Sequence, residues 1–287
     1  MKHIGRLALF LFLAVNAFFI GMLLLTAYSP YINPEVHPVQ SCLGLTFPIF
    51  LVINFCFLVF WLIVRYRLAL VPLLGFLLCY PQIRTYMPIN MEPSGQPENS
   101  IKLLSYNIMS FGNMKKENGQ NPILNYIKNS KADIVCMQEY AGSETAKIHL
   151  NNKEIRQALK DYPYRHIKQV GKTGAGSQIA CYSKFPILSA RMLDYQSNYN
   201  GSMVYDIKIG KDTVLLINNH LESNKLTRED KVVYEDMLKD PKAGKVKSGI
   251  RQLVNKLAEA SAIRSAQARA IAQEIARSPY PSVIVCG

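Results

Sequence analysis

Cysteine is scarce in this chain, and its spacing fits no metal pattern. The six cysteines form no Cys-x-x-Cys pair and no zinc-binding spacing, so the sequence gives no basis for a zinc module. Cys136, Cys181 and Cys286 each lie inside an apolar run typical of a strand. A free cysteine there behaves as a small buried hydrophobic residue, and we interpret these three in that way. They neither require nor exclude an oxidising compartment.

Acidic residues are almost missing from the first 84 positions, which hold five Lys or Arg and one acid, Glu35. Leu7–Tyr28 is an uncharged apolar run, long enough to cross a bilayer at about 20 residues, and Gly44–Val64 is a second one. Leu68–Ile83 is shorter and contains two prolines and a glycine, so it is a marginal third span, or a re-entrant or interfacial segment. Residues 1–86 therefore read as a membrane region with two or three transmembrane helices.

The positions of the basic residues predict an orientation. Lys2 and Arg6 precede the first run, Arg65 and Arg67 lie between the second and third, and the loop Ser29–Leu43 has no Lys or Arg. The positive-inside rule then places the N-terminus in the cytoplasm. Three spans put the rest of the chain on the periplasmic face of a bacterial inner membrane. Two spans would leave it in the cytoplasm, whereas cleavage of the first run as a signal peptide would preserve the outer location.

The remainder of the chain alternates between predicted strands and helices. Residues 87–100 hold three prolines and read as a linker. Beyond it, periodicity predicts an α/β domain over 101–287. We expect strands at Ile101–Ile108, Ile134–Gln138, Ile179–Ser183, Met203–Ile209, Thr213–Asn218 and Ser282–Cys286, and helices at Pro122–Ser130, Ser143–Leu159 and Arg251–Arg277. We interpret Leu226–Gly249 as Lys-rich and irregular.

Three polar side chains come at or just beyond the ends of predicted strands. Asn107 is placed to bind a phosphate oxygen or a metal-bound water, or is an ordinary turn asparagine. Glu139 offers the carboxylate oxygen that Mg²⁺ prefers, or is a surface glutamate. His220 is placed to donate a hydrogen bond to a phosphate oxygen as charge develops, or is structural. We interpret His149 and His166 as surface residues.

Two further residues and one glycine-rich segment have less specific signals. Tyr182 either lines a substrate cleft or packs in the core, and Asn218 is placed to orient His220. The segment Gly171–Ser177 lacks the Lys-Ser/Thr ending of a phosphate loop, and we interpret it as a hairpin turn.

Taken in order, four segments resemble the motifs of the endonuclease/exonuclease/phosphatase family of metal-dependent phosphoesterases. They are Ser105–Ile108, Met137–Glu139, Tyr182–Ile187 and Asn218–Leu221. The resemblance covers about Ile101–Gly287. It implies a β-sandwich of two packed mixed sheets flanked by helices, with the site in the cleft at their edge.

The resemblance also implies roles for individual residues. Glu139 would hold Mg²⁺ or Mn²⁺, Asn107 and His220 would fix the phosphoryl oxygens, and Tyr182 and Asn218 would contact substrate. The family's Asp-x-Asn motif and a later Asp-His pair would follow Gly287. We therefore expect the chain to be truncated, its sandwich and active site to be incomplete, and the chain itself to be inactive.

Substrate and partners stay open at this point. The surplus of Lys and Arg beyond Arg84, 28 against 19 acids, suits an anionic partner such as nucleic acid, phospholipid headgroups or a membrane surface, or only aids solubility. No obligate protein partner is inferred. The alternative function is a catalytically inactive family member that binds phosphates, lipids or a partner.

Overall fold

The computed structural model describes residues 2–90, 95, 97, 100–112, 119–142, 150–171, 178–195, 197, 199–240 and 243–287. Their internal contacts divide the chain into two compact units. The first comprises Met1–Ser94 and Asn224–Ser265, and the second comprises Gly95–Ser223 and Ala266–Gly287. The prediction for Gly171–Ser177 falls almost entirely outside the described residues, and that for His149 does so completely.

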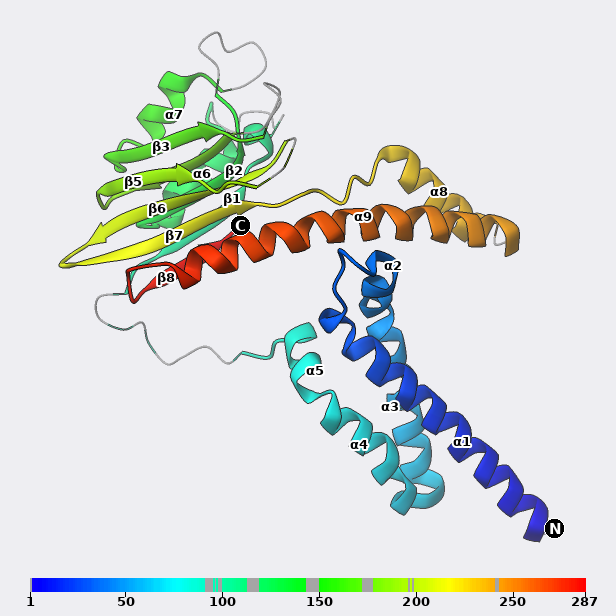
Figure 1. Cartoon of the computed structure of the whole chain (residues 1–287). Coiled ribbons are helices and arrows are strands. Elements are labelled where there is room, and N and C mark those ends of the chain that lie inside the picture. Colours follow the sequence, from blue (N-terminus) through cyan, green and yellow to red (C-terminus); the bar gives the residue numbers. More distant parts are fainter. Residues whose placement is uncertain are drawn as a thin grey trace. The chain divides into compact units, whose positions relative to one another are not determined.

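The N-terminal part of the first unit is helical (Figure 1). Its α-helices are α1 (Lys2–Ala27), α2 (Pro38–Ser41), α3 (Phe47–Arg65), α4 (Leu70–Leu78) and α5 (Tyr80–Tyr86), joined by the 3-10 helices η1 (Ser29–Tyr31), η2 (Cys42–Thr46) and η3 (Tyr66–Ala69). Two segments, Arg6–Ala27 and Pro38–Leu78, are long and apolar enough to cross a membrane. The marginal third run is broken at Cys79 between α4 and α5. The nine residues of α4 rise only about 14 Å, less than the ~30 Å hydrocarbon core.

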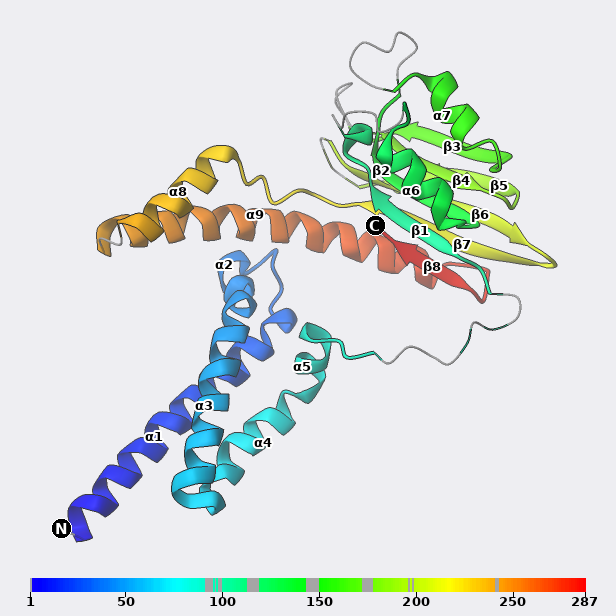
Figure 2. The same ribbon diagram turned by 180° about the vertical axis from the view of Figure 1, so that it is seen from behind.

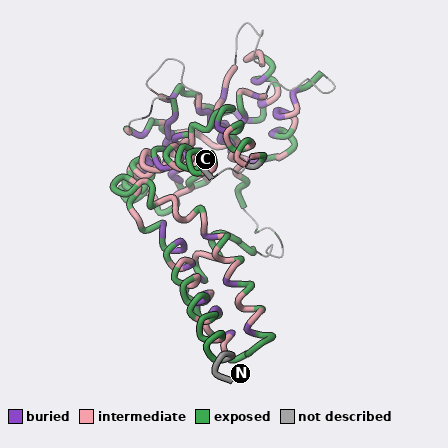
Figure 3. The backbone as a smooth tube through the Cα atoms, turned by 90° about the vertical axis from the view of Figure 1, so that its right-hand side faces the viewer, coloured by how far each residue is buried: buried purple, intermediate pink, exposed green. Residues whose placement is uncertain are grey.

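Large apolar side chains are exposed along α1 and α3. Phe10 is 67% exposed, Phe18 63% and Ile63 80%, and Figure 3 shows that exposed positions recur along the helices nearest the N-terminus. An apolar surface of this extent on a protein marks contact with another apolar phase or partner. It agrees with a membrane location.

A buried polar network joins α1 to α3. The indole Nε1 of Trp61 donates to Asn16 Oδ1 at 3.0 Å, Asn16 Nδ2 donates to Asn54 Oδ1 at 3.5 Å, and Asn54 Nδ2 donates to the Phe19 carbonyl at 3.0 Å. Asn16, Asn54 and Trp61 are each fully buried. Hydrogen bonds of this kind hold helices together where lipid removes the hydrophobic drive for association.

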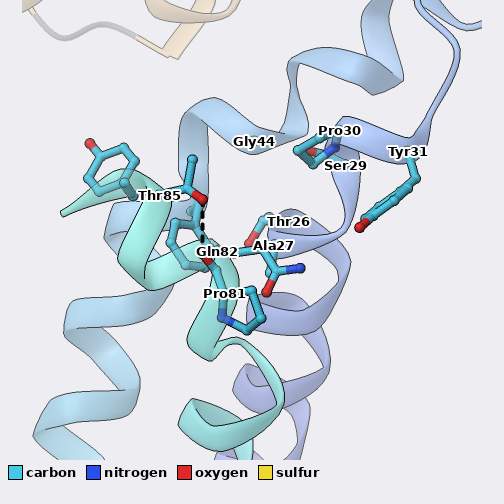
Figure 4. A pocket seen from close by; sticks show the side chains of 11 residues that line it. Thr26, Ala27, Ser29, Pro30, Tyr31, Gly44, Pro81, Gln82 and Thr85 are labelled. Atoms are coloured by element: carbon cyan, nitrogen blue, oxygen red, sulfur yellow. Dashed lines mark hydrogen bonds between the residues drawn. The ribbon is translucent and has the colours of Figure 1, made fainter. Parts of the chain in front are cut away.

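A pocket of about 400 Å³ opens where α1 ends, between η1, the start of α3 and α5 (Figure 4). Its lining is uncharged and combines Phe47, Tyr31 and Tyr86 with small and hydroxyl side chains. Gln82 contributes the one amide of this lining, and its Oε1 is buried without a hydrogen-bond partner among the described residues.

The segment expected to be irregular contains a helix instead. α8 (Arg228–Lys239) and the first turns of α9 (Ala243–Ala276) occupy most of Leu226–Gly249, so that prediction was wrong. A capping box begins α8, in which the Thr227 side chain accepts from Asp230 N and the Asp230 carboxylate accepts from Thr227 N. The abundance of Lys concealed this start signal.

Asp230 also ties α8 to α9. Its carboxylate is 2% exposed and accepts from Lys256 Nζ at 2.6 Å and from Gln252 Nε2 at 3.0 Å. Lys256, and then the Thr227 backbone N–H, hold the pKa of Asp230 well below its usual range. Because the folded pKa is depressed, the stabilisation is present above the ordinary value of 3.8 and is lost as the pH falls below it.

We predict that Asp230→Ala loosens the α8–α9 pair, because it removes the cap and leaves Lys256 without this carboxylate. Amide hydrogen exchange should accelerate in α8 and leave the strands of the second unit unchanged. Asp236→Ala, at an exposed position of the same helix, is the matched control. Equal exchange in both variants would contradict the anchoring role.

The second unit is a β-sandwich with an α/β arrangement, as the sequence predicted (Figures 1 and 2). One sheet has the order β1-β2-β4-β3 and the other has the order β5-β6-β7-β8. The strands are β1 (Leu103–Asn107), β2 (Ile134–Tyr140), β3 (Tyr164–Gln169), β4 (Gln178–Ser183), β5 (Ile187–Met192), β6 (Gly201–Ile209), β7 (Asp212–His220) and β8 (Val283–Cys286). Both sheets are mixed, since β1–β2 and β7–β8 are parallel pairs and the others are antiparallel.

Three apolar layers hold this unit together. The helices α6 (Pro122–Ser130) and α7 (Asn152–Ala158) cover the outer face of the first sheet, and the last turns of α9 cover the outer face of the second through Ile271. The layer between the sheets contains Ile134, Tyr205 and Leu216. Alternate residues of each central strand thus enter different layers, as a two-sided sheet requires.

The predicted elements match the observed ones unevenly. The Pro122–Ser130 helix is confirmed to the residue, because Asn121 caps it and Pro122 suits its first turn. β3 and β5 were missed. Both are largely exposed: β3 carries mostly polar residues, and β5 places its apolar residues without strict alternation. Of the expected helix Ser143–Leu159, residues 143–149 lie outside the described residues. In the remainder the helix is shorter than expected, since α7 begins only at Asn152, after the extended N-cap residue Asn151.

Candidate active site

The parallel pairing of β1 and β2 brings two of the predicted site residues together. Asn107 is the register partner of Gln138. Asn107, at the end of β1, and Glu139, next to Gln138 on β2, therefore lie at the same edge of the sheet. Asn107 Nδ2 donates to Glu139 Oε1 at 2.9 Å, and Asn107 Oδ1 accepts from Met109 N at 3.2 Å. The amide is held from both sides, and its orientation is thereby fixed.

A β-bulge releases Glu139 from the core. Val135 and Met137 point into the α6–α7 layer, and strict alternation would send residue 139 there too. The register of β2 against β4 shifts between Met137 and Tyr140, and Tyr140 takes that core position instead. Glu139 adopts φ 52°, a left-handed conformation that costs a non-glycine residue about 1–2 kcal/mol. Strain of this kind is typical of functional sites.

His220 reaches the same carboxylate from the other sheet. It is the last residue of β7, and its Nε2 lies 3.6 Å from Glu139 Oε1. The His220 side chain is 18% exposed, against 36% for Glu139. Burial lowers the pKa of His220, and the nearby Glu139 carboxylate raises it by less. The imidazole is therefore neutral at pH 7 and retains one N–H donor.

A buried amide pair joins the two sheets directly behind these groups. Gln138 Nε2 donates to Asn218 Oδ1 at 2.5 Å and to Ser105 Oγ at 3.2 Å. Asn218 Nδ2 in turn donates to the Ala180 carbonyl at 3.3 Å. Gln138 precedes Glu139, and Asn218 lies two residues before His220, so this bond sets the distance between the carboxylate and the imidazole. Sequence reasoning assigned no role to Gln138, although it lies inside the Gln-Glu pair.

We predict that Gln138→Leu lowers the free energy of unfolding by about 1–3 kcal/mol, because it leaves the buried Asn218 Oδ1 without its hydrogen-bond donor. Chemical denaturation measures this change. Gln157→Leu, at an exposed position of α7, should be nearly neutral and is the matched control. A neutral effect at Gln138 would show that the pair contributes no net stability.

A second hydrogen-bond chain holds the end of β8 against β7. Tyr195 and Ser202 share a hydrogen bond of 2.7 Å between their hydroxyls, Ser202 Oγ donates to Asn219 Oδ1 at 2.6 Å, and Asn219 Nδ2 donates to the Cys286 carbonyl at 2.9 Å. A Cβ at Gly287 would lie 2.7 Å from the Asn219 carbonyl oxygen, so only glycine fits this close approach. Because β8 runs parallel to β7, it ends at the edge that holds His220.

The structure thus brings Asn107, Glu139 and His220 together and places Asn218 behind them. Tyr182 is elsewhere. It is 1% exposed, belongs to the α6–α7 layer and faces the Tyr140 hydroxyl at 3.2 Å. Along β4, Ile179 and Cys181 point into the layer between the sheets, whereas Tyr182 points to the opposite face, toward α6 and α7. Its burial there favours packing in the core over lining a substrate cleft.

His166 is not the surface residue that we expected. Its ring packs edge-on against Tyr205 with centroids 5.7 Å apart, and its Nδ1 is buried without a hydrogen-bond partner among the described residues. Burial lowers its pKa. The position on β3, an unrecognised strand, explains the wrong expectation.

The residues at this sheet edge could supply some, but not all, of the ligands of a divalent cation. Across the described residues, no group of three or more His, Cys, Asp or Glu side chains is placed to hold a metal ion. Mg²⁺ commonly uses one or two carboxylates and completes its shell with water and substrate phosphate. The Glu139 side chain is partly exposed at the sheet edge and suits the role of one such ligand.

Comparison with known proteins agrees with the resemblance found in the sequence motifs. A family model described as "Endonuclease/Exonuclease/phosphatase family" matches residues 104–287, and a domain of unknown function matches residues 9–86. No curated protein matches the chain.

Solved structures are similar to the chain at low identity. A truncated Caenorhabditis elegans TDP2 is 20% identical, with 53% of this chain covered and a TM-score of 0.33. Staphylococcus aureus beta toxin is 19% identical, with 48% covered and a TM-score of 0.32. D. rerio TDP2, in complex with a single-strand DNA product, is 14% identical, with 50% covered and a TM-score of 0.33. The chain spans 57% of the length of each of these proteins.

Proposed function

The chain belongs to the endonuclease/exonuclease/phosphatase family, and on that premise we propose that it forms the metal-binding part of a phosphoesterase that hydrolyses phosphodiester or phosphomonoester bonds. Members of the family are phosphoester hydrolases and generally use divalent metal ions. The observation that carries the proposal is the convergence of Asn107 and His220 on one carboxylate, Glu139, from two different sheets.

Each residue has a defined part in this proposal. Glu139 holds Mg²⁺ or Mn²⁺, which supplies charge neutralisation and polarisation of the phosphate when bound. Asn107 keeps the Glu139 carboxylate oriented through its Nδ2 and stands beside the incoming phosphate. The neutral imidazole of His220 donates a hydrogen bond to a non-bridging phosphoryl oxygen, where negative charge develops.

The substrate class follows from location and charge in the same proposal. The exposed apolar helices support membrane anchoring. Two described segments are long enough to span, and with two spans the positive-inside rule favours the cytoplasmic face for the phosphoesterase unit over the periplasmic face that three spans would give. The basic surplus of the domain favours polyanions or anionic headgroups. The D. rerio relative was solved with single-strand DNA, and nucleic acid and phospholipid are therefore the two substrate classes to compare.

The test is hydrolysis by the protein encoded by the complete reading frame, since the chain spans only part of its relatives. Single-stranded DNA, RNA and phospholipid vesicles are each offered with Mg²⁺, with Mn²⁺ and with EDTA. Metal-dependent cleavage of one class is the expected result. Absence of cleavage of all three, with binding retained, would replace the proposal by the inactive binding member.

That second candidate has its own support. Among the described residues, Glu139 is the acid that contacts both Asn107 and His220, and one carboxylate binds Mg²⁺ weakly without further ligands. A family member that binds phosphate through Asn107 and His220 and does not hydrolyse it would use the same geometry. Isothermal titration with inorganic phosphate in EDTA distinguishes the two, because binding without metal is expected only of the second.

A further inference from the structure

Three thiols meet in the layer between the two sheets. Cys136 of β2, Cys181 of β4 and Cys286 of β8 belong to one apolar cluster, and the Cys136 thiol contacts the other two. All three are free. Cys136 and Cys181 are fully buried, whereas Cys286 is half-buried. The second unit therefore gathers its three cysteines at one place, directly behind Gln138 and Glu139.

The backbone pairing makes two of these cysteines direct neighbours. Cys136 and Cys181 are register partners on antiparallel strands. At the start of the same ladder, Lys184 N donates to the Asp133 carbonyl at 2.9 Å, which makes that opposing pair a hydrogen-bonded one. Hydrogen-bonded and non-hydrogen-bonded pairs alternate along an antiparallel ladder.

Counting along the ladder assigns the type of the cysteine pair. Its register runs without a shift from Ile134 to Met137, so the pair three positions beyond Asp133, which is Cys136–Cys181, is non-hydrogen-bonded. Cα atoms in such pairs are about 4.5 Å apart, inside the range of about 4.4–6.8 Å that a disulfide requires. Both side chains point into the same layer, so the two thiols approach without movement of the backbone.

Cys286 does not share this geometry. It lies on the opposite sheet, where its register partner is Asn218. Facing sheets pack about 10 Å apart, beyond the Cα separation of about 7 Å at which a disulfide fails without backbone movement. The Cys136 and Cys286 thiols thus contact each other across the sandwich without the geometry for a disulfide. Cys286 is therefore a matched control for the Cys136–Cys181 pair.

We propose that Cys136 and Cys181 form an oxidisable pair, which closes to a cross-strand disulfide when the protein meets a disulfide oxidant. One thiolate attacks the oxidant's S–S bond and releases a thiol, and the second thiolate then displaces the remaining half as another thiol. One S–S bond forms and one breaks. The protein loses two electrons and two protons, and the oxidant is reduced to two thiols.

The bond would act on the strand that carries the candidate metal ligand. Cys136 lies three residues before Glu139, on the core side of the β-bulge. A disulfide there ties β2 to β4 and closes the chain segment between positions 136 and 181. We expect the midpoint of thermal unfolding to rise by roughly 5 °C or more, because the disulfide restricts the unfolded chain.

The experiment maps disulfides in the whole chain in detergent. Reduced protein is incubated with, or refolded in, oxidised glutathione, alkylated with N-ethylmaleimide, digested and analysed by mass spectrometry. We expect a linked peptide pair containing Cys136 and Cys181 in the wild type. The same pair should form in Cys286→Ala and be missing in Cys181→Ala.

Two outcomes would overturn the proposal. One is folded wild-type protein whose three thiols are all alkylated after oxidation. The other is a linkage to Cys286 in place of Cys181. The wild-type peptide map and its unfolding midpoint decide the matter even if Cys181→Ala fails to fold, and neither readout depends on catalytic activity.

Discussion

Glu139→Ala should abolish metal-dependent phosphoester hydrolysis in the protein encoded by the complete reading frame. The substitution removes the carboxylate on which Asn107 and His220 converge, and with it the proposed charged ligand for Mg²⁺. Turnover of the cleaved substrate class is measured with saturating Mg²⁺. Asp212→Ala removes an exposed acid at the opposite end of β7 and should leave the rate unchanged. Retained turnover in Glu139→Ala would refute the metal assignment.

A second substitution at the same position separates catalysis from stability. Because Glu139 has φ 52°, glycine relieves the left-handed strain that alanine keeps. Glu139→Gly should therefore be as inactive as Glu139→Ala, yet its free energy of unfolding should be higher by about 1 kcal/mol. Equal free energies of unfolding in the two variants would show that the left-handed conformation of residue 139 costs no measurable stability.

The position of Glu139 illustrates how far the sequence could carry the prediction. An acid after a buried apolar run identifies the end of a strand, and the order of four short motifs supplies the family. The bulge at Met137–Tyr140 leaves no such signal, because it depends on how β2 pairs with β4. Simple alternation would have pointed Glu139 into the α6–α7 layer.

The same limit explains why the sequence left the role of Tyr182 open and assigned no role to Gln138. Tyr182 and Asn218 both lie near the ends of their strands, and only the pairing of those strands decides that Tyr182 faces α6 and α7 while Asn218 faces Gln138. Gln138 and Asn218 are 80 residues apart in the chain. A hydrogen bond over that distance follows from two sheets packing face to face, which no local pattern encodes.

His220→Ala should reduce turnover by roughly 10²-fold or more, the effect of removing one hydrogen-bond donor to a developing oxyanion. The loss should fall on kcat more than on KM, because the bond strengthens only as charge develops. His220→Gln, which retains an N–H donor, should recover part of the rate. A near-wild-type rate in His220→Ala would return this residue to the structural interpretation.

His166 is the matched histidine for this test. It is half-buried against Tyr205 and makes no described contact with Glu139, so His166→Ala should lower the unfolding midpoint and leave kcat unchanged. The opposite result, a stable variant with impaired turnover, would mean that the imidazole used in the reaction is not His220.

The ionisation of His220 gives this prediction a readout that does not need turnover. Burial depresses its folded pKa below the ordinary 6.5, so the unfolded chain binds this proton more readily than the folded one. Stability contributed by neutral His220 is therefore present above pH 6.5 and is lost as the pH falls through the folded value. NMR titration of the imidazole should give a midpoint below 6.5, and Glu139→Ala should lower it further, because Glu139 is the group that raises it. A midpoint above pH 7 would make the side chain mostly a cation at neutral pH and would change its proposed part from a neutral donor to a charged one.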